Sequence, residues 1–328
     1  MEQSKRNNSK KSWLLVKFLI AGASLWFIYQ TLLGKASLKE WLEVIRVAVK
    51  TDNHPQLFAL VMLMMLINWS LEAVKWRMMI SKIETLGFFR SLEAVFSGLT
   101  VSFFTPNRVG EFAGRVFHLG KADRIEATLI TVVENLSQLI ITLVAGSIFS
   151  IVYIHHFVSI PDFIRIALSI LLFLFALSCV LLYLNVSILQ RISGNSKRVK
   201  SWHHYLRVFS LYSSRELFVV LFLAAIRYLV FSTQFYLLLI LFGIQINFWL
   251  SLVLISMTYF AMTIVPTIAW LELGIRGTVA AYFFSAVVLD ISGVVNASIT
   301  LWIINVVVPA LIGSLFVFGF KLGKRREQ

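Results

Sequence analysis

The chain has 328 residues, of which 59% are hydrophobic and 14% charged, and its mean hydropathy is +0.83. A soluble domain of this size would keep too little polar surface to face water, so these values exclude a soluble enzyme or binding domain. The formal net charge of +14 could suggest a nucleic-acid-binding protein, but the basic residues lie at the ends of apolar runs, as in membrane proteins.

The apolar runs predict an all-α fold, a polytopic membrane helical bundle that forms one transmembrane domain over residues 1–328. Six runs have about the length of 20 residues that a helix needs to cross a hydrocarbon core of ~30 Å. They do not alternate apolar and polar residues as barrel strands do. We expect these six spans at 13–33, 56–80, 127–154, 163–184, 217–242 and 297–320.

The first span follows a charged stub, residues 1–12, and could instead be a signal peptide. Ala21-Gly22-Ala23 resembles a cleavage site. However, Lys17 interrupts the candidate hydrophobic region, and apolar sequence continues beyond Ala23. We therefore expect an uncleaved span.

The distribution of lysine and arginine orients the spans. The segments 155–162, 243–247 and 289–296 contain neither residue, whereas basic residues gather in 1–12, 81–126, 185–215 and 321–328. Because basic loops stay on the cytoplasmic side, we expect a multi-pass protein of the plasma (inner) membrane with both termini in the cytoplasm. Apolar residues at helical spacing predict surface helices in 34–54 and in the loop 185–215, although the latter could also be a solvated basic loop.

Two further apolar regions, 94–120 and 248–288, are interrupted by Pro106 and Pro266. Proline lacks the backbone N–H and clashes with the preceding helical turn, so each region should break into two arms. We expect two re-entrant helical hairpins, or full spans in their place, which would give eight spans. The positions predicted to interrupt helices are Pro106, Gly110, Pro266 and Gly274.

A Glu-x-x-x-Arg pair follows each proline: Glu111 and Arg115 after the first, Glu272 and Arg276 after the second. Residues four apart share one helix face and can form an ion pair. The first hairpin would enter from the cytoplasm and the second from the opposite side. An inverted repeat around a midplane site would produce this pattern, and chance similarity of two short motifs is the alternative.

A helix that begins inside the membrane has free backbone N–H groups and a partial positive charge at its start. Two such N-termini that face one another would form an anion site. Arg108 and Arg276 would add full positive charge and could each hold a phosphate through two hydrogen bonds. Glu111 and Glu272 would hold the arginines in place or receive a cationic group.

Other ionisable residues, Glu72, Glu134 and Arg227, lie deep within predicted spans. Charged groups at such depth usually mark functional sites. They could instead form buried ion pairs, such as Glu134 with Arg227, that fix the packing. The candidate substrate-binding residues are Arg108, Glu111, Arg115, Glu134, Arg227, Glu272 and Arg276.

The motifs TPNRVGEFAGR, VPTIAWLELGIRG and VVEN resemble those of the lysylphosphatidylglycerol synthase transmembrane-region family, a family of flippase-like membrane proteins. Two positions depart from the family pattern: Gly277 replaces a common glutamate after Arg276, and Asn135 replaces a usual arginine after Glu134. The resemblance implies a lipid-translocating module. Larger members carry a soluble aminoacyl-transfer domain, which we do not expect here because the chain ends soon after Phe320.

No sequence pattern indicates catalysis, a cofactor or a metal site. An Asp-x-Asp metal motif, a phosphate-binding loop and an H-E-x-x-H motif are all missing, so we expect no enzyme activity. The expected function is a flippase or transporter that binds an anionic (glyco)phospholipid, with membrane lipids and no nucleic acid as partners. The alternatives are a transporter of a small ion or solute, and a membrane enzyme or partner subunit in cell-envelope lipid synthesis.

Overall fold

The computed structural model describes residues 54–103, 105, 109–187, 205, 207–264 and 269–317, together with 43, 46 and 50. Of His54 and residues 269–273 it describes only the backbone. Within these ranges all regular secondary structure is helical. The predicted span 13–33 and tail 321–328 lie outside the described residues, as do most of the predicted surface helices in 34–54 and 185–215.

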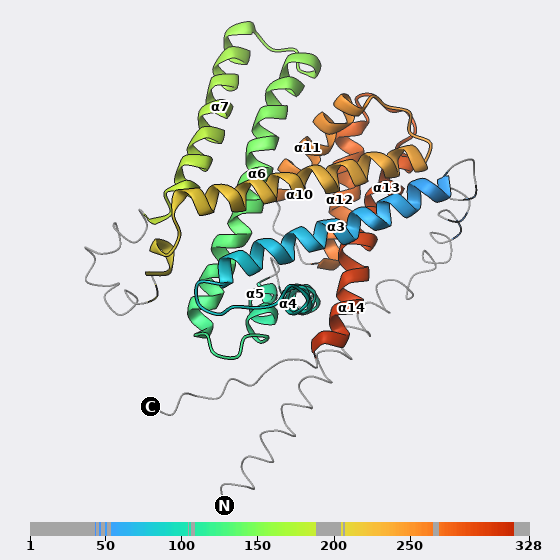
Figure 1. The fold of residues 1–328 in the computed structure, drawn as a ribbon. Helices are drawn as coiled ribbons and strands as arrows, with labels where there is room; N and C mark the ends of the chain where they lie inside the picture. Colours follow the sequence, from blue (N-terminus) through green and yellow to red (C-terminus); the bar gives the residue numbers. More distant parts are fainter. Residues whose placement is uncertain are drawn as a thin grey trace, which may run out of the picture.

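The helices follow the predicted order and confirm a polytopic helical membrane protein (Figure 1). In chain order they are α3 (His54–Ile80), α4 (Phe88–Ser102), α5 (Gly110–Val116), α6 (Arg124–Phe157), α7 (Asp162–Leu184), the 3-10 helix η3 (Arg207–Ser210), α10 (Ser214–Leu241), α11 (Phe248–Ile264), α12 (Ala269–Phe284), α13 (Ile291–Trp302), the π-helix η4 (Ile303–Val307) and α14 (Val308–Phe316). Among the described residues, five helical stretches are long and apolar enough to cross a membrane: 55–80, 124–157, 162–184, 214–241 and 291–316.

Both broken regions have the predicted two arms. α4 ends at Ser102 before α5 begins at Gly110, and α11 ends at Ile264 before α12 begins at Ala269. Pro106 and Pro266 themselves lie outside the described residues. The predicted interruption at Gly274 is wrong, because α12 continues through it. A helix interior tolerates one glycine at about 1 kcal/mol relative to alanine, and good helix formers surround this one.

The long helices α3 and α10 lie side by side and antiparallel, and both cross α6 at a steep angle (Figure 1). Two hydrogen bonds tie the pair together. The Gln234 side chain donates to the Val61 carbonyl (2.9 Å) near one end, and the Tyr212 hydroxyl donates to the Met79 carbonyl (2.7 Å) near the other. These two contacts pair the start of α3 with the end of α10 and the end of α3 with the chain just before the start of α10, so the two helices run in opposite directions.

Each of these helices begins one unit of an internal repeat. α10 and α11 start 160 residues after α3 and α4, respectively. α4 packs against α14, the last helix of the second unit, and α11 packs against α6, the last helix of the first unit. In Figure 1, α4 and α5 lie below the α3–α10 pair and α11 lies above it. Each unit thus packs its first hairpin arm on the other unit, as an inverted repeat would, and the inversion relative to the membrane stays a prediction.

Two glycines occupy equivalent places in the repeat, at the points where these hairpin arms come closest. Gly146 and Gly313 each lie 22 residues beyond the first residue of their helical stretch. A Cβ on Gly146 would lie 2.4 Å from the Phe260 side chain, and one on Gly313 would lie 2.1 Å from the Phe96 carbonyl oxygen. Only a residue without a side chain permits this close helix packing.

Gly146→Ala and Gly313→Ala should each destabilise the protein by about 1–3 kcal/mol, because a new methyl group must enter a filled space. Gly313→Ala should have the larger effect, since its neighbour is backbone and cannot rotate away. Gly274→Ala is the matched control: among the described atoms none lies within 4 Å of its added Cβ, so the substitution should be neutral or stabilising. Thermal unfolding in detergent measures all three. An unfolding midpoint for Gly313→Ala as high as that of Gly274→Ala would contradict the packing.

Candidate functional site

A network of six charged side chains lies between four helices. Its members are Glu72 and Lys75 of α3, Glu111 and Arg115 of α5, Glu134 of α6 and Arg227 of α10. The side chains of Lys75, Arg115 and Glu134 are fully buried. Three carboxylates match three cations, so the network carries no net charge. Such neutrality is what a low-dielectric interior requires of buried ions.

Arg115 is the centre of this network. Its guanidinium donates to Glu134 (2.9 Å) and Glu72 (2.6 Å), and it also pairs with Glu111. The Lys75 ammonium group lies 2.8 Å from Glu134 and 3.0 Å from Glu72. The predicted pair of Glu111 with Arg115 is therefore confirmed, and it is one edge of a larger network.

The pair of Glu134 with Arg227, considered as a packing alternative, is wrong. Glu134 pairs with Arg115 and Lys75, whereas Arg227 reaches Glu72 at 3.0 Å. The reason is that α10 packs along α3, which brings Arg227 to a residue of α3.

Close packing of α5 on α4 positions Arg115 and Glu111. A Cβ on Gly114 would lie 2.5 Å from the Gly98 Cα atom, so the two helices approach closely at this glycine. His118, just beyond α5, is hydrogen-bonded to the Ser97 hydroxyl at 2.8 Å. A helix of seven residues cannot be stable alone, so these contacts hold it in place.

Glu84, in the connection between α3 and α4, binds the loop that follows α5. Its carboxylate accepts hydrogen bonds from the backbone N–H groups of Gly120, Lys121 and Ala122, at 2.7 to 3.1 Å. Burial raises the pKa of the Glu84 carboxyl, but these three donors together with the positive charge of Arg90 outweigh it and hold the pKa below its ordinary value. The loop from α5 to α6 is thus fixed by one side chain.

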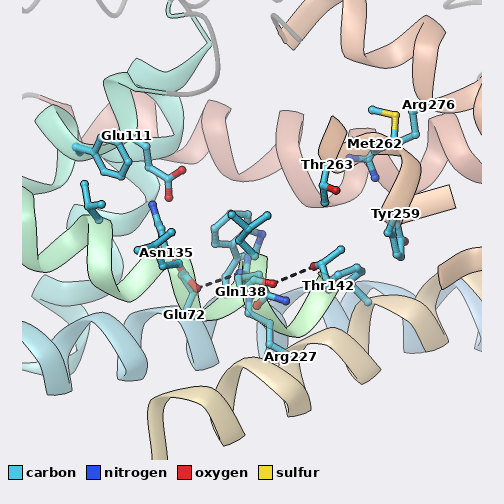
Figure 2. A pocket seen from close by; sticks show the side chains of 16 residues that line it. Glu72, Glu111, Asn135, Gln138, Thr142, Arg227, Tyr259, Met262, Thr263 and Arg276 are labelled. Atoms are coloured by element: carbon cyan, nitrogen blue, oxygen red, sulfur yellow. Dashed lines mark hydrogen bonds and ion pairs between the residues drawn. The ribbon is translucent and has the colours of Figure 1, made fainter. Parts of the chain in front are cut away.

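A cavity of about 530 Å³ opens beside the network (Figure 2). Its volume is in the range of ligand-binding pockets. α3, α5, α6, α10, α11 and α12 all contribute to its wall, so both hairpins take part. The charged residues of the wall are Glu72, Glu111, Arg227 and Arg276, and the uncharged polar residues include Asn135, Gln138, Thr142, Tyr259 and Thr263.

Several hydrogen-bond donors in the wall have no protein acceptor within the described part of the chain. They are the Trp69 Nε1, Gln138 Nε2, Arg227 Nε and Tyr259 Oη atoms, all buried. Trp69 is 4% exposed and Tyr259 6%. A buried donor without an acceptor costs about 1–3 kcal/mol. The cavity is therefore suited to a ligand or water that brings acceptor atoms.

Ring contacts orient the two arginines of the cavity. The Arg227 guanidinium lies 5.2 Å from the centre of the Trp69 ring, and that of Arg276 lies 5.8 Å from the centre of the Tyr259 ring. Arg227 also donates to the Gln138 amide oxygen at 3.3 Å. Figure 2 shows Arg227 and Arg276 on different sides of the cavity.

The predicted site residues fall into three groups. Glu111, Arg227 and Arg276 line the cavity. Arg115 and Glu134 lie in the network behind the wall, where their side chains are fully buried. Arg108 and the Glu272 side chain lie outside the described residues.

Sequence reasoning did not select Lys75, Trp69 or Tyr259. Lys75 gave a usable signal, because a lysine three residues after Glu72 lies on the same helix face inside a predicted span. Trp69 and Tyr259 gave none, since an aromatic residue in an apolar helix has the same pattern whether it packs or lines a cavity. Within the described residues, no group of three or more histidine, cysteine, aspartate or glutamate side chains could hold a metal ion.

Residues 14–316 match the model of a protein family described as "Lysylphosphatidylglycerol synthase TM region". This match agrees with the resemblance of the sequence motifs. Searches of curated proteins and of solved structures gave no match.

Glu84→Gln should lower the unfolding midpoint, because a neutral amide binds the three N–H groups less strongly than a carboxylate does. Since the folded-state pKa lies below the ordinary value, the stabilisation is present above about pH 4.3 and is lost as the pH falls through the folded-state pKa. The midpoint difference between wild type and variant should therefore shrink in acid. Glu93→Gln controls for the loss of one carboxylate charge. A difference that stays constant from neutral to acidic pH would contradict this account.

Proposed function

The chain belongs to the lysylphosphatidylglycerol synthase transmembrane-region family, and we propose that it is a flippase or transporter that binds an anionic phospholipid headgroup in the cavity between its two hairpins. It is a multi-pass membrane protein of a family linked to lipids, so membrane lipids surround it. The observation that carries the proposal is a cavity with two arginines, lined by residues whose buried donors have no acceptor in the described part of the chain.

A phosphodiester matches this wall in charge and in hydrogen bonding. Its oxygen atoms accept hydrogen bonds, and a guanidinium can bind two of them at once. Arg227 comes from α10 and Arg276 from α12, so the headgroup would hold two helices of the second unit together. The Gln138 amide and the Tyr259 hydroxyl would donate further hydrogen bonds to the headgroup from the cavity wall.

The inverted repeat supports translocation as well as binding. Both hairpins contribute to the cavity wall, the first through Glu111 on α5 and the second through Tyr259 on α11 and Arg276 on α12. In transporters built this way, substrate sites lie between the repeats, and movement of one repeat against the other exposes the site to each side in turn. We infer that a headgroup crosses through this cavity while its acyl chains stay in the lipid.

We also infer that the protein lies in the plasma membrane with both termini in the cytoplasm, because basic residues gather in alternate connections. In a Cys179→Ala background, Ile160→Cys should react with a membrane-impermeant maleimide in intact cells. Lys197→Cys should react only after the membrane is permeabilised. The background without an added cysteine controls for nonspecific labelling, and reaction of both cysteines from outside would overturn the orientation.

Arg227→Gln and Arg276→Gln should each weaken binding of fluorescent phosphatidylglycerol about 10- to 100-fold, since each removes a charged hydrogen bond worth about 1.5–3 kcal/mol. Lysine at either position should cost less, because it keeps the charge and loses the two-point contact. If both arginines bind one phosphate, the double variant should deviate from additivity by about 0.5–3 kcal/mol. The assay is lipid binding by the purified protein.

Arg165→Gln is the matched control, because Arg165 pairs with Asp162 at the start of α7 and does not line the cavity. Additive effects of the two cavity substitutions would place the arginines at separate sites. Competition by glycerol phosphate as strong as that by the whole lipid would favour transport of a small solute. Unchanged lipid binding in both single variants would contradict the proposal.

A further inference from the structure

The charged network is neutral only with Arg227 counted, and Arg227 lines the cavity that a ligand would enter. We propose that Glu111 binds a proton when an anionic headgroup engages Arg227, so that binding of the lipid is coupled to uptake of one proton. This inference rests on the proposed function and adds to it a coupling ion and the residue that carries it. The proton comes from water in the cavity and leaves again when the lipid leaves.

Arg227 is the network cation that faces the cavity. Its side chain is 14% exposed, whereas those of Lys75 and Arg115 are fully buried. Its guanidinium lies 3.0 Å from a Glu72 carboxylate oxygen, and both residues line the cavity. An anion that enters the cavity therefore competes with Glu72 for Arg227 and does not reach the other two network cations.

The rest of the network cannot replace the charge that the ligand takes. Without Arg227, three carboxylates share Arg115 and Lys75. Arg115 already pairs with three of them, and Lys75 with two. Glu72 then pairs more strongly with Arg115 and Lys75, which weakens the attraction of these two cations for Glu111 and Glu134. An excess negative charge in a buried, low-dielectric network is strongly unfavourable, and a proton removes it.

Glu111 is the carboxylate best placed to take that proton. Its side chain is 13% exposed and lines the cavity, whereas Glu72 is 3% exposed and Glu134 fully buried. In the described part of the chain Glu111 pairs with Arg115, and Arg115 also pairs with the other two carboxylates of the network. Figure 2 shows the Glu111 carboxylate pointing into the cavity, where water can reach it.

The charged and titratable groups around Glu111 come from several helices. Arg115 lies on the same helix, Glu134 on α6, and Glu72 with Lys75 on α3. Across the cavity lie Arg227 of α10 and Arg276 of α12, the latter four residues after Glu272, its predicted partner. On the side of α4, His118 is hydrogen-bonded to Ser97 and does not line the cavity. Among the cations of this set, Arg227 is the one that both belongs to the network and lines the cavity.

The test measures binding of fluorescent phosphatidylglycerol to the full-length protein in phosphatidylcholine nanodiscs between about pH 5 and pH 8, where this phosphodiester stays ionised. Uptake of one proton makes the dissociation constant rise about tenfold per pH unit, over the range in which Glu111 is ionised in the free protein and protonated in the complex. Calorimetry in two buffers of different ionisation enthalpy should count one proton taken up per lipid in that range.

Glu111→Gln should abolish the pH dependence, because the amide needs no proton. At pH 8 this variant should bind the lipid more tightly than wild type, since its network loses the excess negative charge in the complex. Glu93→Gln, which removes a carboxylate of α4 that does not line the cavity, should keep the wild-type pH dependence. Even if Glu111→Gln does not fold, the proton count on the wild-type protein decides whether lipid binding is coupled to proton uptake.

The outcomes separate this inference from the proposed function. Lipid binding with no pH dependence and no proton uptake would overturn the coupling and leave the lipid site intact. A wild-type pH dependence that persists in Glu111→Gln would overturn the assignment to Glu111. Absence of lipid binding at every pH would remove the proposed function, and the coupling with it.

Discussion

The shared pairing of Arg115 with three carboxylates is the interaction on which this structure depends. It joins α5 to α3 and α6 inside an apolar protein, and Lys75 and Arg227 complete the charge balance. Loss of one partner from a buried ion pair costs roughly 3–5 kcal/mol, because the other charge stays buried without compensation. The network therefore adds to the contacts with α4 that hold the short helix α5 in place.

The network also makes the two halves of the repeat chemically different. Gln138 and Asn305 lie 14 residues beyond the start of their helical stretches, at equivalent places. In one half Gln138 contacts the charged Arg227, and in the other Asn305 contacts the neutral Asn68 at 3.0 Å. The cavity is therefore asymmetric, with acidic residues on α3 and α5 and arginines on α10 and α12.

The fold explains how polar groups and lipid can be neighbours. The hairpins interrupt the helical backbone, which is tolerated within a membrane where irregular backbone lies in protein or lines a cavity. Outward-facing residues are apolar, as on α7, where Phe163 is 72% exposed and Leu171 62%.

The sequence by itself determined the five helical spans between residues 55 and 316, the two interrupted regions and the pair of Glu111 with Arg115. Apolar length, proline chemistry and spacing along one helix are local properties, which is why the sequence carries them. It also predicted that charged residues would line a cavity, since lipid does not accept them. Only the tertiary structure decided that Arg227 binds Glu72 and that Tyr259 faces the same cavity. Those contacts join residues on different helices, and their distances depend on which helices pack together and at what rotation, which no local pattern in the chain encodes.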